Sequence, residues 1–124
     1  MKDQLDCLAS TIWYEAGNQP KAGRIAVAEV VLMRVKKSAR PTTACAVVRR
    51  HKQFSFVHNG HIPRVPDERV QEMLTLARGV VNGTMRSRMH GAMYFHATGA
   101  SPGWKLPLIG QIGQHLFYGD EVRS

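Results

Sequence analysis

Glu15 is the residue in this sequence that most clearly suggests acid–base chemistry. It follows Trp13 and Tyr14 in a chain with nine acidic residues against 17 lysines and arginines. The apolar spacing predicts a helix over Gln4–Ala16, so Glu15 falls in the last turn, where the helix dipole disfavours an anion. Burial beside the two aromatic rings would also disfavour the ionised form, and both effects raise the pKa. A glutamic acid of this kind is how glycosidases protonate a leaving oxygen; the alternative is a solvent-exposed glutamate at a helix end.

Polar and aromatic residues outside this helix are candidates for binding a sugar chain. Alternation along a strand would point Tyr94 and His96 to one face, opposite their neighbour Phe95. An indole in the turn-rich loop around Trp104 would offer a stacking surface. The alternatives are a turn role for Gln53 and Ser55, core packing for Trp104 and a structural role for His115. The predicted substrate-binding residues are Gln53, Ser55, Tyr94, His96, Trp104 and His115.

Four helices are expected to position these residues. Asp3 is a suitable N-cap for the first helix, and Pro20 lies in the first turn of the second, which is apolar on nearly every side and predicts a central buried helix. Thr42 or Thr43 would cap the third helix and Asp67 the fourth. The expected helices run from Gln4 to Ala16, from Pro20 to Lys37, through residues 42–51 and from Asp67 to Gly83.

The C-terminal third differs from the helical segments in its residue pattern. The segments MHGAMYFHA and IGQHLFYGD are short, aromatic and bounded by glycine or proline, which predicts a small β-hairpin or an irregular arm. The chain shows no repeats and no linker-like change of composition. The expected fold class is therefore mainly α (α+β), in a single domain over residues 1–124.

The formal net charge of +8 predicts a polyanionic partner. The basic residues are scattered, without a long cluster and without a ladder of aromatic residues of the kind that binds single strands. No specific nucleic acid is therefore expected as a partner, although a basic nucleic-acid-binding module stays an alternative. An anionic cell-wall polymer fits the same charge.

Cysteine and histidine spacing argues against a metal centre. Cys7 and Cys45 lack CxxC or Cys/His ligand spacing, which predicts buried free thiols and neither a disulfide nor a zinc site. The six histidines include no HExxH motif, so no metal and no cofactor is expected. No run of ~18 apolar residues is present, and Asp3 and Asp6 interrupt the N-terminal segment, so neither a membrane anchor nor an export signal is expected.

Six blocks of the sequence resemble the SleB/CwlJ family of cell wall hydrolases. The family pattern is LA..IY.EA, then G..AVA.VVLNRV, QFS, A.YFH, P.W and a closing IG.H.FY. This chain has, in the same order and between Cys7 and Tyr118, LASTIWYEA, AGRIAVAEVVLMRV, KQFSF, GAMYFHA, SPGWK and IGQHLFY. One departure is Met33 in place of asparagine. Arg34, beside it on an apolar helix, is expected to pair with a carboxylate or a backbone carbonyl.

This resemblance implies a lysozyme-like fold related to lytic transglycosylases, activity on peptidoglycan, and Glu15 as the catalytic acid. In such enzymes one glutamic acid acts at the bond between MurNAc and GlcNAc, and the 6-hydroxyl of the substrate closes a 1,6-anhydro ring. A hydrolytic muramidase would need a second carboxylate. Glu29 is the best candidate because it is the one acid inside an apolar segment. A cell-wall-binding module without catalysis is a further alternative.

The expected partner is the glycan strand of peptidoglycan, and the expected state is a monomer. A basic chain without an export signal or a separate wall-binding domain fits a phage-type endolysin. Such a protein is made in the cytoplasm and acts in the periplasm or cell wall after release, where it causes bacterial lysis.

Overall fold

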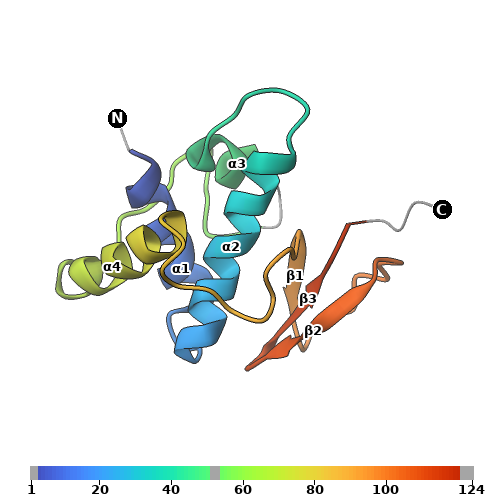
Figure 1. Cartoon of the computed structure of the whole chain (residues 1–124). Helices are drawn as coiled ribbons and strands as arrows, with labels where there is room; N and C mark the ends of the chain where they lie inside the picture. The colour runs from blue at the N-terminus through green and yellow to red at the C-terminus, as the bar shows by residue number, and fades with distance from the viewer. Residues whose placement is uncertain (1–2, 51–53, 121–124) are drawn as a thin grey trace.

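The computed structural model describes residues 3–50 and 54–120. In these ranges four α-helices form a body, and a three-stranded antiparallel sheet packs against it (Figure 1). The prediction of a mainly helical fold with a small β arm is confirmed. The elements are α1 (Gln4–Ala16), α2 (Lys21–Lys37), α3 (Ala44–Arg50), the 3-10 turn η1 (Asp67–Arg69), α4 (Val70–Val81), β1 (Tyr94–Ala97), β2 (Leu108–Ile112) and β3 (His115–Tyr118).

Helix α1 begins and ends where the sequence predicted. The Asp3 carboxylate accepts a hydrogen bond of 2.9 Å from the N–H of Asp6, which satisfies a free donor of the first turn. At the other end, the N–H of Gly17 donates to the carbonyl of Trp13 at 3.0 Å. A Cβ at Gly17 would lie 2.6 Å from that carbonyl oxygen, so this close approach requires a glycine.

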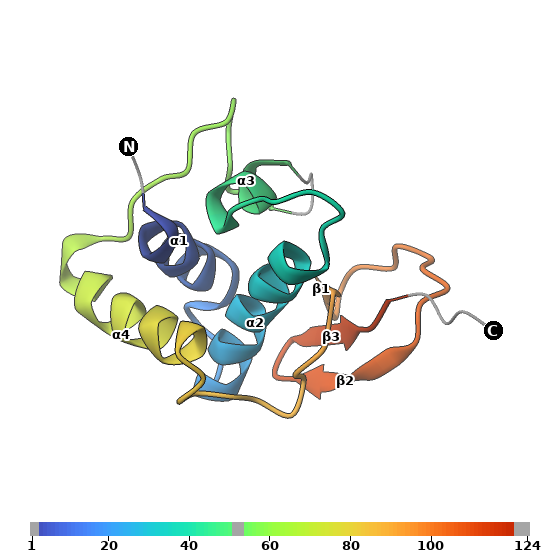
Figure 2. The same cartoon turned by 45° about the horizontal axis from the view of Figure 1, so that its top comes forward.

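Helix α2 is the central helix and links the body to the sheet. It contacts α1, α3 and α4 as well as β1, and Figure 2 shows it between the other helices and the strands. Val27, Val30 and Val31 are completely buried, as the uninterrupted apolar sequence predicted. None of the helices in the described part of the chain is long and apolar enough to cross a membrane.

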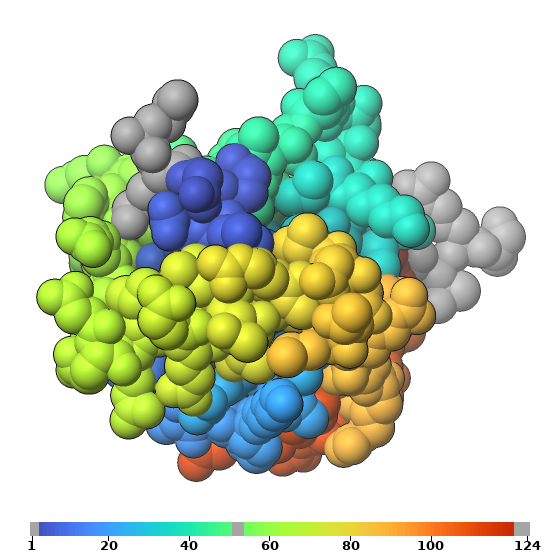
Figure 3. Space-filling model, turned by 60° about the vertical axis from the view of Figure 1, so that its left-hand side comes forward, coloured from blue at the N-terminus to red at the C-terminus, as the bar shows by residue number. Residues whose placement is uncertain are grey.

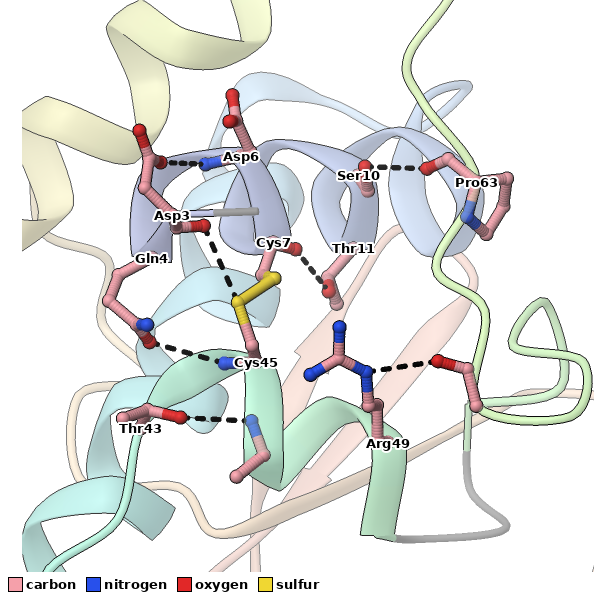
Figure 4. The surroundings of a disulfide bond; sticks show 12 residues. Asp3, Gln4, Asp6, Cys7, Ser10, Thr11, Thr43, Cys45, Arg49 and Pro63 are labelled. Carbon is pink, nitrogen blue, oxygen red and sulfur yellow. Dashed lines mark hydrogen bonds between the residues drawn. A yellow bond between two sulfur atoms is a disulfide. The ribbon is translucent and has the colours of Figure 1, made fainter. Parts of the chain in front are cut away.

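The two cysteines form a disulfide, so the prediction of free thiols is wrong. Cys7 in α1 and Cys45 in α3 are 38 residues apart, yet their Cα atoms lie 5.2 Å from each other because the two helices pack together (Figure 4). The start of α3 is held by Thr43, whose hydroxyl accepts from the N–H of Ala46 at 3.1 Å, and by the Gln4 side chain, which accepts from the N–H of Cys45. The spacing of the cysteines along the chain could not reveal this pairing, because it depends on how α1 and α3 pack together.

Helix α4 is preceded by one turn of 3-10 helix. The structure places the start of that turn at Pro66, which has no side chain to cap it, so the predicted cap by Asp67 is wrong. The fixed φ of proline sets the entry into the turn. Met73, Leu76 and Ala77 are buried, and α4 packs against α1 and α2. In Figure 3, α4 in yellow-green lies against α1 in dark blue.

The sheet has the strand order β1-β3-β2, with Tyr94 opposite Tyr118 and Phe95 opposite Phe117. Phe95 and Phe117 are buried in the core that the sheet shares with the helices, and we call their side of the sheet the inner face. Side chains alternate along a strand, so Tyr94, His96 and Tyr118 lie on the outer face. The predicted common face of Tyr94 and His96 is confirmed.

Candidate active site

Glu15 lies half-buried in the last turn of α1. It follows Leu8 by seven residues and Thr11 by four, so the three side chains share one stripe of the helix, and the other two are completely buried. Within residues 3–50 and 54–120, the Glu15 carboxylate has no hydrogen bond or ion pair. Burial raises its pKa from 4.5 to about 7. At neutral pH the group can therefore both give and accept a proton, as acid–base catalysis requires.

The turn that carries Glu15 is held by polar contacts on two sides. Arg24 donates to the carbonyl oxygen of Gly17 at 2.9 Å and pairs with Glu72 of α4 at 2.9 Å. Its guanidinium thereby satisfies a free carbonyl at the negative end of the helix. On the other side, the Tyr14 hydroxyl donates to a backbone carbonyl in the segment between α3 and α4 at 2.8 Å.

A row of aromatic rings runs from the end of α1 to the inner face of the sheet. Tyr14 stacks on Phe56 with ring centroids 5.3 Å apart, and Phe56 contacts Phe54 at 6.3 Å. Phe54 is buried and lies 6.2 Å from Phe95, which contacts His115 at 5.2 Å. The row begins at Tyr14, the neighbour of Glu15 in the chain, and so extends apolar surface from the end of α1 to the sheet.

His115 begins β3 and lies on the inner face of the sheet. It is buried, and its Nδ1 has no hydrogen-bond partner among the described residues. Burial lowers the pKa of His115, and the nearby imidazole of His96 lowers it further. A neutral ring packed between Phe95 and Phe117 fits the structural role that the sequence left open.

Four rings form a cluster on the outer face of the sheet. His96 lies 5.2 Å from Trp104 and 5.2 Å from Tyr118. Trp104 also contacts Tyr94 at 5.9 Å and Tyr118 at 5.4 Å, and it is 36 % exposed. The structure therefore brings together three of the predicted binding residues, which come from β1 and from the loop between β1 and β2. We call Tyr94, His96, Trp104 and Tyr118 the outer aromatic cluster.

Tyr118 is the member of this cluster that the sequence analysis missed. Its hydroxyl lies 2.9 Å from Nε2 of His96, while Nδ1 lies 2.7 Å from the carbonyl oxygen of Ala97. A carbonyl only accepts, so Nδ1 carries a proton, and in the neutral ring Nε2 accepts from Tyr118. Alternation in HLFY would put Tyr118 on one face with Leu116, but its position opposite Tyr94 follows only from the register.

Arg34 supports the outer aromatic cluster from α2. Its Nε donates to the carbonyl oxygen of Met93 at 2.6 Å, and its guanidinium carbon lies 4.6 Å from the centre of the Tyr94 ring. The expected pairing with a backbone carbonyl is confirmed. Burial lowers the pKa of Arg34, and the charge is stabilised by the face of the aromatic ring.

The structure places one of the two loop residues predicted to bind substrate. Gln53 lies outside the described residues. Ser55 is exposed in a turn after Phe54 and lines a cavity of about 320 Å³ together with Arg49 and Arg50.

Glu29, the candidate for a second catalytic carboxylate, already has hydrogen-bond partners within the protein. It is buried, accepts hydrogen bonds from the N–H and the hydroxyl of Ser87, and lies 3.4 Å from Nδ1 of His90. These contacts attach the segment between α4 and β1 to α2. All other acids in the described ranges are exposed except Glu15. The same ranges contain no group of three or more His, Cys, Asp or Glu side chains that could hold a metal ion.

Residues 18–118 match the sequence model of the family described as Cell Wall Hydrolase. The chain belongs to this family. The resemblance of its motifs to the SleB/CwlJ hydrolases is therefore confirmed. The match begins three residues after Glu15, so the role of Glu15 is inferred from its position, its burial and the motif around it.

Similar proteins include spore cortex-lytic enzymes. The enzyme of Oceanobacillus iheyensis is 30 % identical over 118 residues, which cover 94 % of this chain and 41 % of the relative. The enzyme of Bacillus subtilis is 32 % identical over 112 residues, which cover 89 % of this chain and 35 % of the relative. The chain thus spans less than half the length of these relatives.

Two solved structures share the fold. The catalytic domain of the germination-specific lytic transglycosylase SleB from Bacillus anthracis has a TM-score of 0.77 and 26 % identity, with 95 % of both chains covered. The catalytic domain of the Bacillus cereus SleB protein has a TM-score of 0.76 and 26 % identity, with 93 % of this chain and 88 % of the other covered. The fold of this cell wall hydrolase is therefore that of a SleB catalytic domain.

Proposed function

We propose that this cell wall hydrolase is a lytic transglycosylase that cleaves the bond between MurNAc and GlcNAc in the glycan strands of peptidoglycan. The observation that carries the proposal is Glu15, a half-buried acid whose pKa burial raises to about 7 and which has no partner in the described ranges. The similarity to a solved lytic transglycosylase domain, over 95 % of both chains, supports it.

Glu15 acts as an acid and then as a base in this reaction. Protonated Glu15 donates to the glycosidic oxygen, so the bond to C1 of MurNAc breaks and GlcNAc leaves as an alcohol. The acetamido oxygen of MurNAc assists by bonding to C1. Ionised Glu15 then removes the proton of the 6-hydroxyl, whose oxygen displaces the acetamido oxygen at C1. The product is a 1,6-anhydro ring, Glu15 is protonated again, and no water is consumed.

The contacts of Glu29 favour this route over hydrolysis. A muramidase needs a second carboxylate that is free to attack C1 or to activate water. Glu29 instead accepts hydrogen bonds from Ser87, so its oxygens are committed to holding a neighbouring segment. A mechanism with one acid and an internal nucleophile requires no such group.

The outer aromatic cluster supports a role in binding sugar rings. Trp104 presents an exposed indole, and Tyr94 and His96 pack beside it at 5.9 and 5.2 Å, so the rings form a preformed stacking surface. Gln53 and Ser55 are proposed to contact the glycan in the loop after α3, and His115 to support the site from the inner face of the sheet.

Replacing Glu15 by glutamine tests the catalytic role. Glu15→Gln keeps the shape of the side chain but cannot transfer the proton, so we expect turbidity clearance of permeabilised cells to fall by at least ~100-fold while the fold is retained. Glu68→Gln, which changes an exposed acid in the 3-10 turn, is the matched control and should keep full activity. A folded Glu15→Gln protein with near-normal activity would refute the assignment.

Mass spectrometry of the digested wall tests the chemistry. The proposal predicts muropeptides that end in 1,6-anhydro-MurNAc, lighter than the hydrolysis product by one water. Reducing ends would instead indicate a muramidase. In that case Glu29→Gln should abolish turnover, whereas the transglycosylase proposal expects it to reduce activity far less than Glu15→Gln does.

The proposed place of action is the periplasm or the cell wall. Disulfides such as Cys7–Cys45 persist in oxidising compartments, which supports activity outside the cytoplasm. A monomeric state, the absence of a specific nucleic-acid partner and a phage-type endolysin role remain predictions.

A further inference from the structure

The loop between α1 and α2 contains a buried amide, Gln19. Its Oε1 accepts a hydrogen bond of 2.8 Å from the N–H of Gln114. Its Nε2 donates to Oε1 of Gln114 at 3.1 Å and to Oδ1 of Asn18 at 3.1 Å. Gln114 belongs to the turn between β2 and β3, 95 residues further along the chain. One buried side chain therefore joins the helical body to the end of the sheet.

The turn between β2 and β3 is shaped around Gln19. Gly113 has a φ of +55°, and a Cβ at this position would overlap Oε1 of Gln19 and lie 3.0 Å from Pro20. The carbonyl of Gln114 accepts from the N–H of Thr98 at 2.9 Å, which ties the turn to the end of β1. In Figures 1 and 2 the loop before α2 and the turn after β2 lie side by side. The amide of Gln19 is thus fixed on both sides.

This contact connects the two elements that carry Glu15 and His115. The N–H of Gln19 donates to the carbonyl of Ala16 at 2.9 Å, one residue after Glu15, so Gln19 is part of the turn that ends α1. Gln114 directly precedes His115, the first residue of β3. The pairing of the two glutamines therefore links the end of α1 to the start of β3.

Other contacts hold the same turn without Gln19. Arg24 binds the carbonyl of Gly17 and is itself paired with Glu72 of α4. The core packing of α1 also does not depend on Gln19, because Ile12 and Ala16 are completely buried among the helices. Removing the Gln19 amide should therefore alter the placement of the turn without unfolding the body.

We propose that Gln19 is a positioning residue, which through its hydrogen bonds to Gln114 orients the last turn of α1, and with it the Glu15 carboxyl group, toward the glycan. The inference rests on the proposed role of Glu15. Gln19 itself touches no reacting atom; it acts through the geometry of the loop. Catalytic rates are sensitive to such placement, since a displacement of ~1 Å can lower a rate by about 100-fold.

Steady-state kinetics on soluble glycan fragments test this role. For Gln19→Ala we expect kcat to fall by about 10- to 100-fold with KM changed by less than about twofold, because binding surfaces on the sheet remain. Gln19→Glu keeps an acceptor for the N–H of Gln114, and the exposed Gln114 amide can turn over to donate, so this variant should restore kcat to within about threefold of the wild type. Gln71→Ala, at an exposed glutamine in α4, is the matched control and should leave kcat unchanged.

Each outcome decides the inference. A folded Gln19→Ala protein with wild-type kcat overturns it, and so does an equal loss for Gln19→Ala and Gln19→Glu. Should Gln19→Ala fail to fold, Gln114→Ala removes only the side-chain half of the contact: a kcat lowered by about threefold supports the inference, and an unchanged kcat overturns it. Full activity of Glu15→Gln would refute the proposed function instead, whatever the Gln19 variants do.

Discussion

In the helical body the proposed site residue is an acid without a partner among the described residues, whereas in the sheet the proposed site residues are rings that contact one another. Glu15 has no hydrogen bond within the described ranges, and burial raises its pKa to about 7. In the outer aromatic cluster, both ring nitrogens of His96 have partners at 2.7 and 2.9 Å, and Trp104 contacts three rings. A poorly solvated acid is suited to proton transfer and a preformed ring surface to binding, so under the proposed function the body carries the chemistry and the sheet the recognition.

The two regions are also attached differently. The body is closed by the Cys7–Cys45 disulfide and a continuous apolar core. The sheet is joined to the body by the inner-face aromatic residues and by a few polar contacts, among them Arg34 to the carbonyl of Met93 and Gln19 to Gln114. Apart from Glu15 and the residues that position it, changes in the body should therefore act mainly on stability, and changes on the outer face mainly on binding.

The largest expected effect is on the body, from loss of the disulfide. The bond closes a loop of 38 residues, and the entropy of loop closure predicts that Cys7→Ser with Cys45→Ser lowers the free energy of unfolding by about 4 kcal/mol. Thermal unfolding should show a Tm lower by roughly 10–15 °C. Reductant should lower the Tm of the wild type and leave that of the double variant unchanged. An equal Tm for the two proteins without reductant would show that the disulfide does not stabilise the body.

The next effect is on the outer face of the sheet. Trp104→Ala removes an exposed ring, so we expect KM for glycan fragments to rise by about 5- to 30-fold, the equivalent of 1–2 kcal/mol, with little change in Tm. Phe117→Leu, at a completely buried ring on the inner face, should show the opposite pattern, with a lower Tm and an unchanged KM. If both variants affect Tm and KM alike, the two faces do not have separate roles.

A smaller effect is the pH dependence of stability that Glu15 imposes on the body. Its pKa is raised from 4.5 to about 7, so between these values the folded chain binds more protons than the unfolded chain. Stability is therefore lost as the pH rises through this window. Glu15→Gln should be a few °C more stable than the wild type at pH 8 and similar to it at pH 4.5. His115 is present in both proteins, so its contribution cancels in the difference between them. A Tm difference that stays the same from pH 4.5 to pH 8 would contradict the raised pKa of Glu15.

The smallest effect concerns charge, which is also divided between the regions. From Tyr94 to Asp120 the one lysine or arginine is Lys105, so nearly all the positive charge belongs to the helical part of the chain. Raising the salt from ~50 to ~200 mM should weaken binding to insoluble cell wall by a few fold through screening. Trp104→Ala should show the same salt dependence as the wild type. A flat response would mean that the charge does not serve wall binding.

The sequence by itself determined the features that depend on neighbours within one turn or one strand. The Asp3 cap, the stop at Gly17 and the apolar stripe between them defined α1, and with it the place of Glu15. The period of two in YFHA separated Tyr94 and His96 from Phe95. These signals are local because a cap, a helical stripe and a strand face each involve residues at most a few positions apart.

The tertiary structure alone decided the pairings between distant segments. The disulfide joins residues 38 apart, Tyr118 lies opposite Tyr94 through the strand register, and Gln19 meets Gln114 across 95 residues. Glu29 likewise became a structural acid only because packing brings the N–H and hydroxyl of Ser87 to its carboxylate. Such contacts depend on how helices and strands pack in three dimensions, and spacing along the chain carries no record of that arrangement.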